Sequence, residues 1–531
     1  MGDTAPTDSS NSSSSEVVES GAPAAPFLAG SPSPGFPVLV EGVPINGPLL
    51  DAAAGEKFLL DVFPIIFQEA VVKGTDVNEK VCEWRPPAEL RALLDVELGE
   101  RGEPHQQLLQ RCRDVIAYSV KTVHPRFYNQ LFAGLDYHAL AARWITEALN
   151  ASVYTYEVAP VGVLLEEEVL RTLRKMVGWT SGDGIFCPGG SVSNMCAMNV
   201  ARFRLCPRVK TAGLSALPRL VLFTSGEAHY SIQKAAAFLG IGTDNVRSVA
   251  VDDRGKMIPS ELERRIEEAK AEGAVPFMVV LTAGTTVLGA FDPIGAVADT
   301  CERRGLWLHV DASWGGSALL SHRHRHLLDG IHRVDSVAWN PHKMLMSGLQ
   351  CCALLLRDDT GLLRSCHSAS ASYLFQTDKC YDSAHDPGDK SVQCGRRDDA
   401  LKLWLAWKAC GRRGLEARVD RAFACARYLA DEIKDKEGFE LLMEPEGTNV
   451  CFWFIPPSMR GQPRGQLFWQ KLDKVAPSIK TRMMLAGSMM VGYQPHGDRV
   501  NFFRMILISP SVRREDLDFC LNEIERLGCD L

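Results

Sequence analysis

The sequence predicts an α/β fold with a mostly parallel central sheet, an N-terminal helical segment and a small C-terminal α+β domain. Between about residues 180 and 360, short apolar runs rich in β-branched residues alternate with helical stretches. Such alternation is typical of a parallel sheet covered by helices on both faces. Residues 55–150 carry apolar side chains at three- and four-residue spacing, which predicts helices. From residue 411 onward, two helical stretches accompany two strand-like runs.

The N-terminal region contains two compositional classes. Residues 1–36 include nine serines and five prolines, and the first basic residue of the chain is Lys57. This segment cannot bury enough apolar surface to offset the entropy of ordering it, so we predict a disordered leader over residues 1–36. Residues 37–150 are predicted to form the N-terminal helical segment, with helices over 58–74 and 105–120.

A large domain is predicted over residues 151–410. Its expected strands are short, apolar and separated by helical stretches, and they cover residues 219–224, 246–251, 277–283, 306–310 and 336–339. A helix is expected over residues 259–273, where Ser260 and Glu263 have the spacing of a capping box. Residues 411–531 are predicted to form the small domain, which closes with a helix.

Composition excludes several classes of protein. The 531 residues are 46% hydrophobic and 23% charged, as in ordinary globular enzymes, and the net charge of −7 gives no basis for binding nucleic acid or an anionic membrane. We find no signal peptide and no apolar run long enough to span a bilayer. Sixteen scattered cysteines without paired CxxC spacing predict a reduced, cytoplasmic protein. His322 and His326 have metal-ligand spacing without a Cys or carboxylate to complete a set, so we expect a solvated turn and no metal.

Polar residues follow the predicted strands at their carboxyl ends, where α/β sheets bind ligands. Gly189-Gly190-Ser191-Val192-Ser193 precedes a helix and favours a phosphate cradle, although Gly-Ser turns before helices are common. Asp311 ends an apolar strand, which indicates a shielded carboxylate in an internal ion pair, a helix cap or a ligand site. Lys343 follows the apolar run 336–339, so it is either a buried nucleophile or a side chain that reaches solvent.

These three features together fit one ligand, pyridoxal 5′-phosphate. The lysine would bond to its aldehyde, the carboxylate would keep the ring nitrogen protonated, and the Gly-Gly-Ser turn would hold the phosphate. His229, in "SGEAHYSIQKAA", is a candidate for stacking on the ring.

Longer motifs carry a family resemblance. They include "HPRFYNQLFAGLD", "GIFCPGGSVSNM", "HVDASWGGSALL", "DSVAWNPHKML", "ASYLFQTDKCYD" and "GYQPHGDRVNFFR". Over roughly residues 38–531 the sequence resembles the group II pyridoxal-phosphate-dependent amino acid decarboxylases. Their fold is the aspartate aminotransferase-like fold type I. The similarity is greatest to the branch of cysteine sulfinate decarboxylase and the glutamate-decarboxylase-like acidic amino acid decarboxylases.

The resemblance implies roles for individual residues. Lys343 would hold the cofactor, Asp311 would pair with the ring nitrogen, and His229 would stack on the ring. Tyr381, in the family's mobile loop, would return a proton to the substrate carbon. The remaining cofactor contacts implied by position are Val192, Ser193, Thr286, His342 and Ser313.

The resemblance also implies an acidic substrate. Gln130 and Arg504 match the residues that hold the distal carboxylate in the glutamate enzymes. Phe132 and Ser372 replace smaller residues of those enzymes, and a phenyl ring should shorten the pocket toward cysteine sulfinate or aspartate. Alternatives are a glutamate decarboxylase that makes GABA, or a catalytically silent paralogue. The family further implies a homodimer whose catalytic loop reaches the neighbouring subunit's site.

Overall fold

The computed structural model describes residues 39–45 and 49–531, so the leader predicted over residues 1–36 lies outside the described residues. The chain divides into two compact units, residues 1–59 and 60–531. The described part of the first unit contains the antiparallel pair β1 (Leu39–Val40) and β2 (Val43–Pro44). Helix α1 (Ala52–Ile65) begins in this unit.

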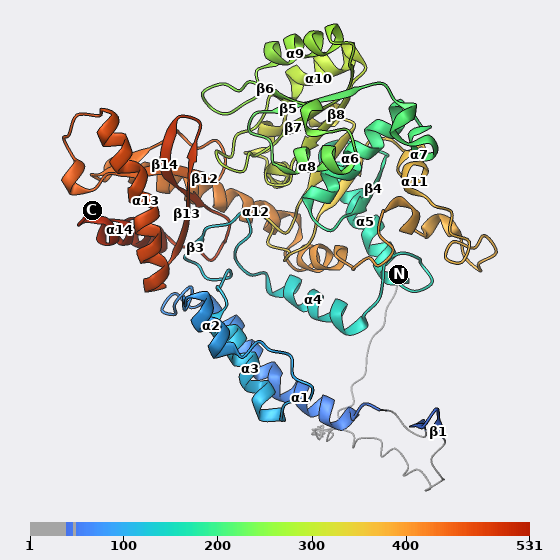
Figure 1. The fold of residues 1–531 in the computed structure, drawn as a ribbon, viewed down its shortest axis with the longest axis horizontal. Coiled ribbons are helices and arrows are strands. Elements are labelled where there is room, and N and C mark those ends of the chain that lie inside the picture. The colour runs from blue at the N-terminus through green and yellow to red at the C-terminus, as the bar shows by residue number, and fades with distance from the viewer. Residues whose placement is uncertain (1–38, 46–48) are drawn as a thin grey trace, which may run out of the picture. The chain divides into compact units, whose positions relative to one another are not determined.

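The second unit contains a seven-stranded sheet, and the strands of it that Figure 1 labels lie together among helices. Its strand order is β4–β10–β9–β8–β7–β5–β6, with β10 antiparallel to both neighbours and the other pairs parallel. The predicted mostly parallel sheet is therefore confirmed. The strands are β4 (Asp183–Phe186), β5 (Leu220–Ser225), β6 (Val246–Val249), β7 (Val275–Thr282), β8 (Trp307–Asp311), β9 (Ser336–Trp339) and β10 (Ala353–Leu356). The sequence analysis missed β4 and β10, which are short and adjoin Gly- and Cys-containing turns.

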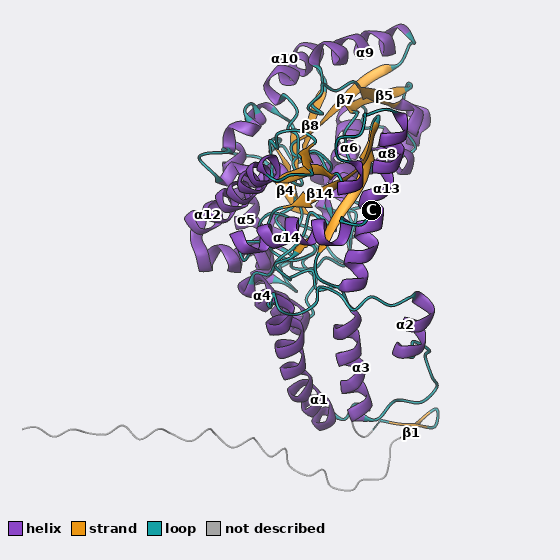
Figure 2. Cartoon of the chain, turned by 90° about the vertical axis from the view of Figure 1, so that its left-hand side faces the viewer, coloured by secondary structure: helices purple, strands orange, loops and turns teal. Residues whose placement is uncertain are grey.

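Helices cover both faces of this sheet (Figure 2). One face packs against α5 (Pro160–Val177), α9 (Pro259–Ala271), α10 (Ile294–Arg304) and α12 (Ala400–Asp435). The other packs against α6 (Gly190–Leu205), α8 (Ser231–Phe238) and α11 (Leu362–His367). Strand alternation divides β8 between them, because Leu308 and Val310 join the first core and Trp307 joins the second.

The second unit also contains a five-stranded sheet of order β11–β12–β14–β13–β3. Its strands are β11 (Phe439–Leu441), β12 (Asn449–Phe454), β13 (Met490–His496), β14 (Arg499–Ile506) and the distant β3 (Phe127–Tyr128). Residues of α12, α13 (Gln466–Ala486) and α14 (Arg514–Gly528) build its core. Helix α12 spans the domain boundary predicted between residues 410 and 411. Its helical geometry is interrupted at Gly411, whose φ is 64°.

The remaining α-helices are α2 (Pro87–Leu94), α3 (His105–Tyr118), α4 (Tyr137–Leu149) and α7 (Val209–Ala212). The capping box expected at Ser260 is wrong: α9 begins at Pro259, so Ser260 already lies in its first turn. Glu263 instead accepts hydrogen bonds from Thr300 (2.8 Å) and Arg304 (3.0 Å) of α10.

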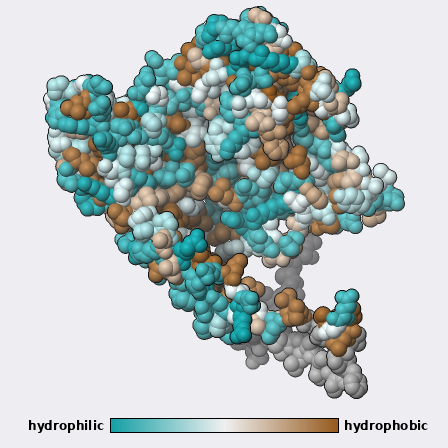
Figure 3. Space-filling view, viewed as in Figure 1, coloured by the Kyte–Doolittle hydropathy of each residue, from teal (hydrophilic) through white to brown (hydrophobic). Residues whose placement is uncertain are grey.

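Figure 3 shows apolar residues scattered among hydrophilic ones on the face in view. Within residues 39–45 and 49–531, no helix has the length and apolar content needed to cross a membrane.

Candidate active site

A cavity of about 340 Å³ opens at the carboxyl ends of β7, β8 and β9. Parallel strands deliver their following residues to the same sheet edge, so segments distant in sequence meet here. Ten of the residues singled out in the sequence line this cavity, namely Phe132, Gly189, Gly190, Ser191, His229, Thr286, Asp311, Ser313, His342 and Lys343.

Lys343 and Asp311 are the oppositely charged groups of the cavity. Burial lowers the pKa of Lys343, and attraction to Asp311 partly offsets this effect. Burial opposes ionisation of Asp311, but Lys343 and hydrogen bonds from Ser313 and Asn194 outweigh it, so the pKa of Asp311 lies below its usual value. The site therefore combines a lysine that loses its proton readily with a carboxylate that stays ionised.

Two histidines line the same cavity as neutral rings. Burial lowers the pKa of His342 to about 4, and its Nδ1 lies 3.0 Å from the carbonyl oxygen of Cys351. Burial also lowers the pKa of His229. His229 Nδ1 lies 2.8 Å from the hydroxyl of Ser231, which fixes the orientation of the imidazole plane.

The turn before α6 supplies backbone donors to the cavity. Gly189 has a φ of 102°, and a Cβ on Gly190 would lie 2.7 Å from Asn340 and 2.8 Å from Ser313, so only glycine fits this close approach. The first amides of a helix have no intrahelical partner, which leaves those of Gly190 and Ser191 to bind an anion.

The predicted phosphate contacts of Val192 and Ser193 stay predictions. Neither residue lines the cavity, and both of their amides donate to the Gly189 carbonyl, at 3.0 and 3.2 Å. Ser193 is fully buried with its hydroxyl 3.5 Å from the same carbonyl, while Val192 packs against the α6 core. Helix α6 begins at Gly190 rather than after Ser193, and Gly190 and Ser191 line the cavity.

Unpartnered polar atoms indicate a polar ligand. Asn340 Oδ1 and Thr282 Oγ1 belong to cavity-lining residues, are buried, and have no hydrogen-bond partner among the described residues. Buried polar groups are otherwise satisfied in folded proteins. A lysine, an ionised carboxylate, a glycine-rich helix start and these unpaired atoms fit pyridoxal 5′-phosphate.

Arg504 on β14 does not line this cavity, but it contacts Thr286, which does. Its guanidinium donates to the carbonyls of Thr286 (2.9 Å) and Asn129 (3.2 Å), and its Nε is buried and unpartnered. Burial lowers its pKa. In the described part of the chain, no carboxylate lies within ion-pairing distance of Arg504. Lys480, whose pKa burial lowers to about 8, donates to Asn129 Oδ1 at 2.8 Å, so a second cation lies nearby.

Gln130, Ser372 and Tyr381 lie outside the cavity of their own chain. Gln130 and Ser372 are exposed. The hydroxyl of Tyr381 donates to Asp386 (3.0 Å) and accepts from Lys379 (3.0 Å). Local polar contacts therefore hold Tyr381 on its own loop, and the structure does not bring the three residues to Lys343 within one chain.

Sequence reasoning missed Asn194 and His309. Asn194 is a buried polar residue in the helical run 194–205, and His309 is fully buried inside β8. A polar side chain within an apolar run needs a partner, and that signal was available in the sequence. Lining residues Asn340, Thr282, Trp314, Tyr230, Leu349 and Gln350 were likewise not assigned to the site.

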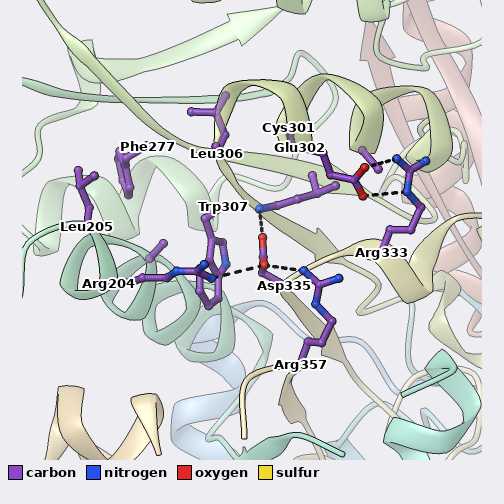
Figure 4. Close-up of a pocket in the computed structure, with 14 residues that line it drawn as sticks. Arg204, Leu205, Phe277, Cys301, Glu302, Leu306, Trp307, Arg333, Asp335 and Arg357 are labelled. Carbon is purple, nitrogen blue, oxygen red and sulfur yellow. Dashed lines mark hydrogen bonds and ion pairs between the residues drawn. The ribbon is translucent and has the colours of Figure 1, made fainter. Parts of the chain in front are cut away.

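A second cavity of about 330 Å³ lies at the opposite ends of β7 and β8 (Figure 4). Its charged residues are paired with each other. Arg333 bonds Glu302 through two nitrogens at 3.0 and 2.7 Å, and Arg357 lies 3.1 Å from Asp335, which Arg204 approaches at 3.7 Å. This cavity lacks the lysine and the glycine-rich helix start found at the other edge.

Comparison with known proteins agrees with this geometry. The chain matches the pyridoxal-dependent decarboxylase conserved domain over residues 87–455. It is 66% identical over 494 residues to acidic amino acid decarboxylase GADL1 of Bos taurus, covering 93% of this chain and 95% of that protein. It is 64% identical over 481 residues to cysteine sulfinic acid decarboxylase of Mus musculus, covering 91% of this chain and 98% of that protein. The crystal structure of mouse CSAD matches with a TM-score of 0.89 and 64% identity, covering 91% of this chain and 100% of that one.

These matches confirm the expected fold type I, the carboxy-lyase activity and the cofactor. A domain match over most of the sequence, relatives that span nearly its whole length, and a cavity suited to pyridoxal phosphate lead to the same conclusion. The chain belongs to the family of pyridoxal-dependent decarboxylases.

Proposed function

We propose that the protein decarboxylates small acidic amino acids, converting cysteine sulfinate to hypotaurine and aspartate to β-alanine. The observation that carries this proposal is Arg504, a buried cation near the cavity with carbonyl partners only. A buried guanidinium without a carboxylate partner favours an anionic ligand, which it can bind with two parallel hydrogen bonds. The names of the relatives from Bos taurus and Mus musculus agree with this substrate class.

Five residues of the cavity, and Tyr381 outside it, would have roles in this reaction. Pyridoxal phosphate would supply an electron sink for the bond that breaks when the carboxylate leaves. Lys343 would hold the cofactor, Asp311 would keep a proton on its ring nitrogen, and His229 would cover one ring face. Gly190 and Ser191 would bind the phosphate through their amides, and Tyr381 would return a proton to the substrate carbon.

Phe132 limits the length of the substrate. Phe132 lines both the catalytic cavity and an adjoining pocket of about 200 Å³, as His342 and Leu349 also do. Glutamate is longer than aspartate by one methylene, and excluding a methylene is worth about 1–3 kcal/mol. We therefore expect cysteine sulfinate and aspartate to be better substrates than glutamate. A glutamate decarboxylase that makes GABA is the second candidate, favoured by the same Arg504.

We further propose a cytoplasmic homodimer that acts in taurine and β-alanine synthesis. In this dimer the loop with Tyr381 and Ser372, together with Gln130, would serve the cavity of the partner subunit. The position of these three residues outside the cavity of their own chain supports this arrangement.

The test is a product assay with purified protein, pyridoxal phosphate and equimolar cysteine sulfinate, aspartate and glutamate. We expect hypotaurine and β-alanine to exceed GABA. Excess GABA would favour the glutamate enzyme, and absence of all three amines from protein that binds the cofactor would favour a silent paralogue. Size measurements with and without cofactor test the dimer.

A further inference from the structure

A chain of hydrogen bonds runs behind Asp311 through the interior of the large sheet. The indole of Trp307 donates to Ser336 Oγ (2.9 Å), and His309 Nδ1 lies 2.8 Å from the same oxygen. His309 Nε2 lies 3.0 Å from Asn194 Oδ1, and Asn194 Nδ2 donates to Asp311 Oδ2 (2.8 Å). All five residues are buried, and none of these four contacts belongs to the roles already proposed.

The fold explains how these residues meet. Trp307, His309 and Asp311 alternate along β8 and so share the sheet face that packs against α6, where Asn194 lies. Ser336 is the register partner of His309 in the parallel pair of β8 and β9.

The carboxylate end of this hydrogen-bond chain fixes the orientation of Asn194. An ionised carboxylate only accepts, so Asn194 donates to Asp311 through Nδ2, and its Oδ1 accepts from His309 Nε2. Burial lowers the pKa of His309 to about 4, so the ring is neutral and its Nδ1 is an acceptor. Ser336 therefore donates to His309 Nδ1 and accepts from the indole of Trp307.

Asn194 is also the branching point of the network. Its Nδ2 donates to Ser231 Oγ at 3.0 Å, and Ser231 lies 2.8 Å from His229 Nδ1. The side-chain amide of Asn194 thus bonds Asp311 directly and is linked to His229 through the hydroxyl of Ser231.

We propose that Asn194 is a positioning residue, oriented by His309, that sets both the ionisation of Asp311 and the plane of His229 before pyridoxal phosphate binds. The inference rests on the proposed role of Asp311 and is independent of which amino acid is the substrate.

Cofactor binding to the apoprotein tests this proposal, measured by absorbance and fluorescence titration without substrate. Asn194→Ala removes both donors and leaves a buried His309 N–H unpaired, so we expect about 10- to 100-fold weaker binding. Asn199→Ala is the matched control, since Asn199 lies on the same helix and bonds Cys366 and Arg202 instead. We expect it to bind within about twofold of wild type. Wild-type affinity in Asn194→Ala would overturn the proposal.

The absorbance spectrum of the bound cofactor separates a positioning role of Asn194 from a role in stability alone, because a loss of stability alone would not change the spectrum. The titratable groups facing Asp311 are Lys343, His309 and His229. Asn194→Asp adds a second carboxylate at hydrogen-bond distance, and such a pair shares a proton near neutral pH. We expect the visible spectrum to titrate between about pH 6 and 8 in Asn194→Asp and to stay constant in wild type and Asn199→Asp. A constant spectrum in Asn194→Asp would contradict the proposal.

Two further variants keep the test decisive. Ser231→Ala removes one hydroxyl, so it remains informative if the Asn194 variants fail to fold. We expect about three- to tenfold weaker cofactor binding from it, and unchanged binding would count against the proposal. Asp311→Asn should abolish the neutral-pH spectrum of the bound cofactor. An unchanged spectrum there would show that the role of Asp311, rather than that of Asn194, is wrong.

Discussion

The two ends of β7 and β8 carry cavities of nearly equal volume, about 340 and 330 Å³, with opposite chemistry. At the amino ends, Arg333 and Arg357 bond carboxylates of the protein itself. At the carboxyl ends, Asn340 and Thr282 carry unpartnered atoms, and Arg504 nearby has carbonyl partners only. The volume of a cavity therefore does not distinguish the ligand site from the other cavity. The unpartnered polar atoms and the unpaired charge at the carboxyl ends distinguish it.

Replacing Lys343 should break the carboxyl-end site completely. Lys343→Ala removes the amine that holds the cofactor, so we expect at least about 10⁴-fold loss of amine formation and loss of the visible absorbance of the bound cofactor. Lys402→Ala is unsuitable as a control because Lys402 is buried beside Asp399. Lys408→Ala, at an exposed lysine, should change neither readout. Retained absorbance in Lys343→Ala would contradict the assignment.

Arg504 tests whether uncompensated charge selects the substrate. In Arg504→Gln we expect KM for cysteine sulfinate and aspartate to rise about 100-fold, because a charge-assisted pair with the substrate is lost, while cofactor affinity stays within about threefold. Arg499→Gln on the same strand is the matched control and should match wild type. An unchanged KM in Arg504→Gln would remove the main argument for an acidic substrate.

Phe132 tests the size of the cavity rather than its charge. Phe132→Ala joins the catalytic cavity to the adjoining pocket, so we expect the ratio of kcat/KM for glutamate to that for aspartate to rise about tenfold. Phe132→Leu should give an intermediate ratio. A ratio that stays constant across both variants would show that another residue sets substrate length.

Asp335 tests the amino-end cavity, where we expect the smallest effect. Asp335→Asn weakens its pairs with Arg357 and Arg204, which are half exposed, so unfolding free energy should fall by about 1 kcal/mol or less. Activity should stay within about twofold of wild type. A large loss of activity with normal cofactor binding would give this cavity a function that its paired charges do not indicate.

The sequence predicted the sheet better than it predicted the cavity. Five of its strands were visible because apolar β-branched runs recur, and Asp311 and Lys343 were found because they end two of them. The start of α6 was predicted too late, after Ser193, because it depends on the positive φ of Gly189, which the pattern does not specify.

Tertiary structure accounts for the other differences. Gln130 and Ser372 are exposed, and Tyr381 bonds Asp386 on its own loop, and the sequence pattern specifies neither arrangement. Asn194 was missed because its partners, Asp311 and Ser231, come from separate parts of the chain. The predicted boundaries at residues 150/151 and 410/411 stay predictions.

The pairing of β3 with β13 has a consequence for how the enzyme is made. Phe127 and Tyr128 adopt their strand only beside Met490 and Val491, and Phe132 follows four residues after Tyr128. A ribosome must therefore synthesise more than nine tenths of the chain before β3 can pair with β13 and the segment from β3 to Phe132 can adopt its folded position. Until then, a nascent polypeptide can contain Lys343, Asp311 and the glycine-rich turn while the segment that leads to Phe132 still lacks its partner strand.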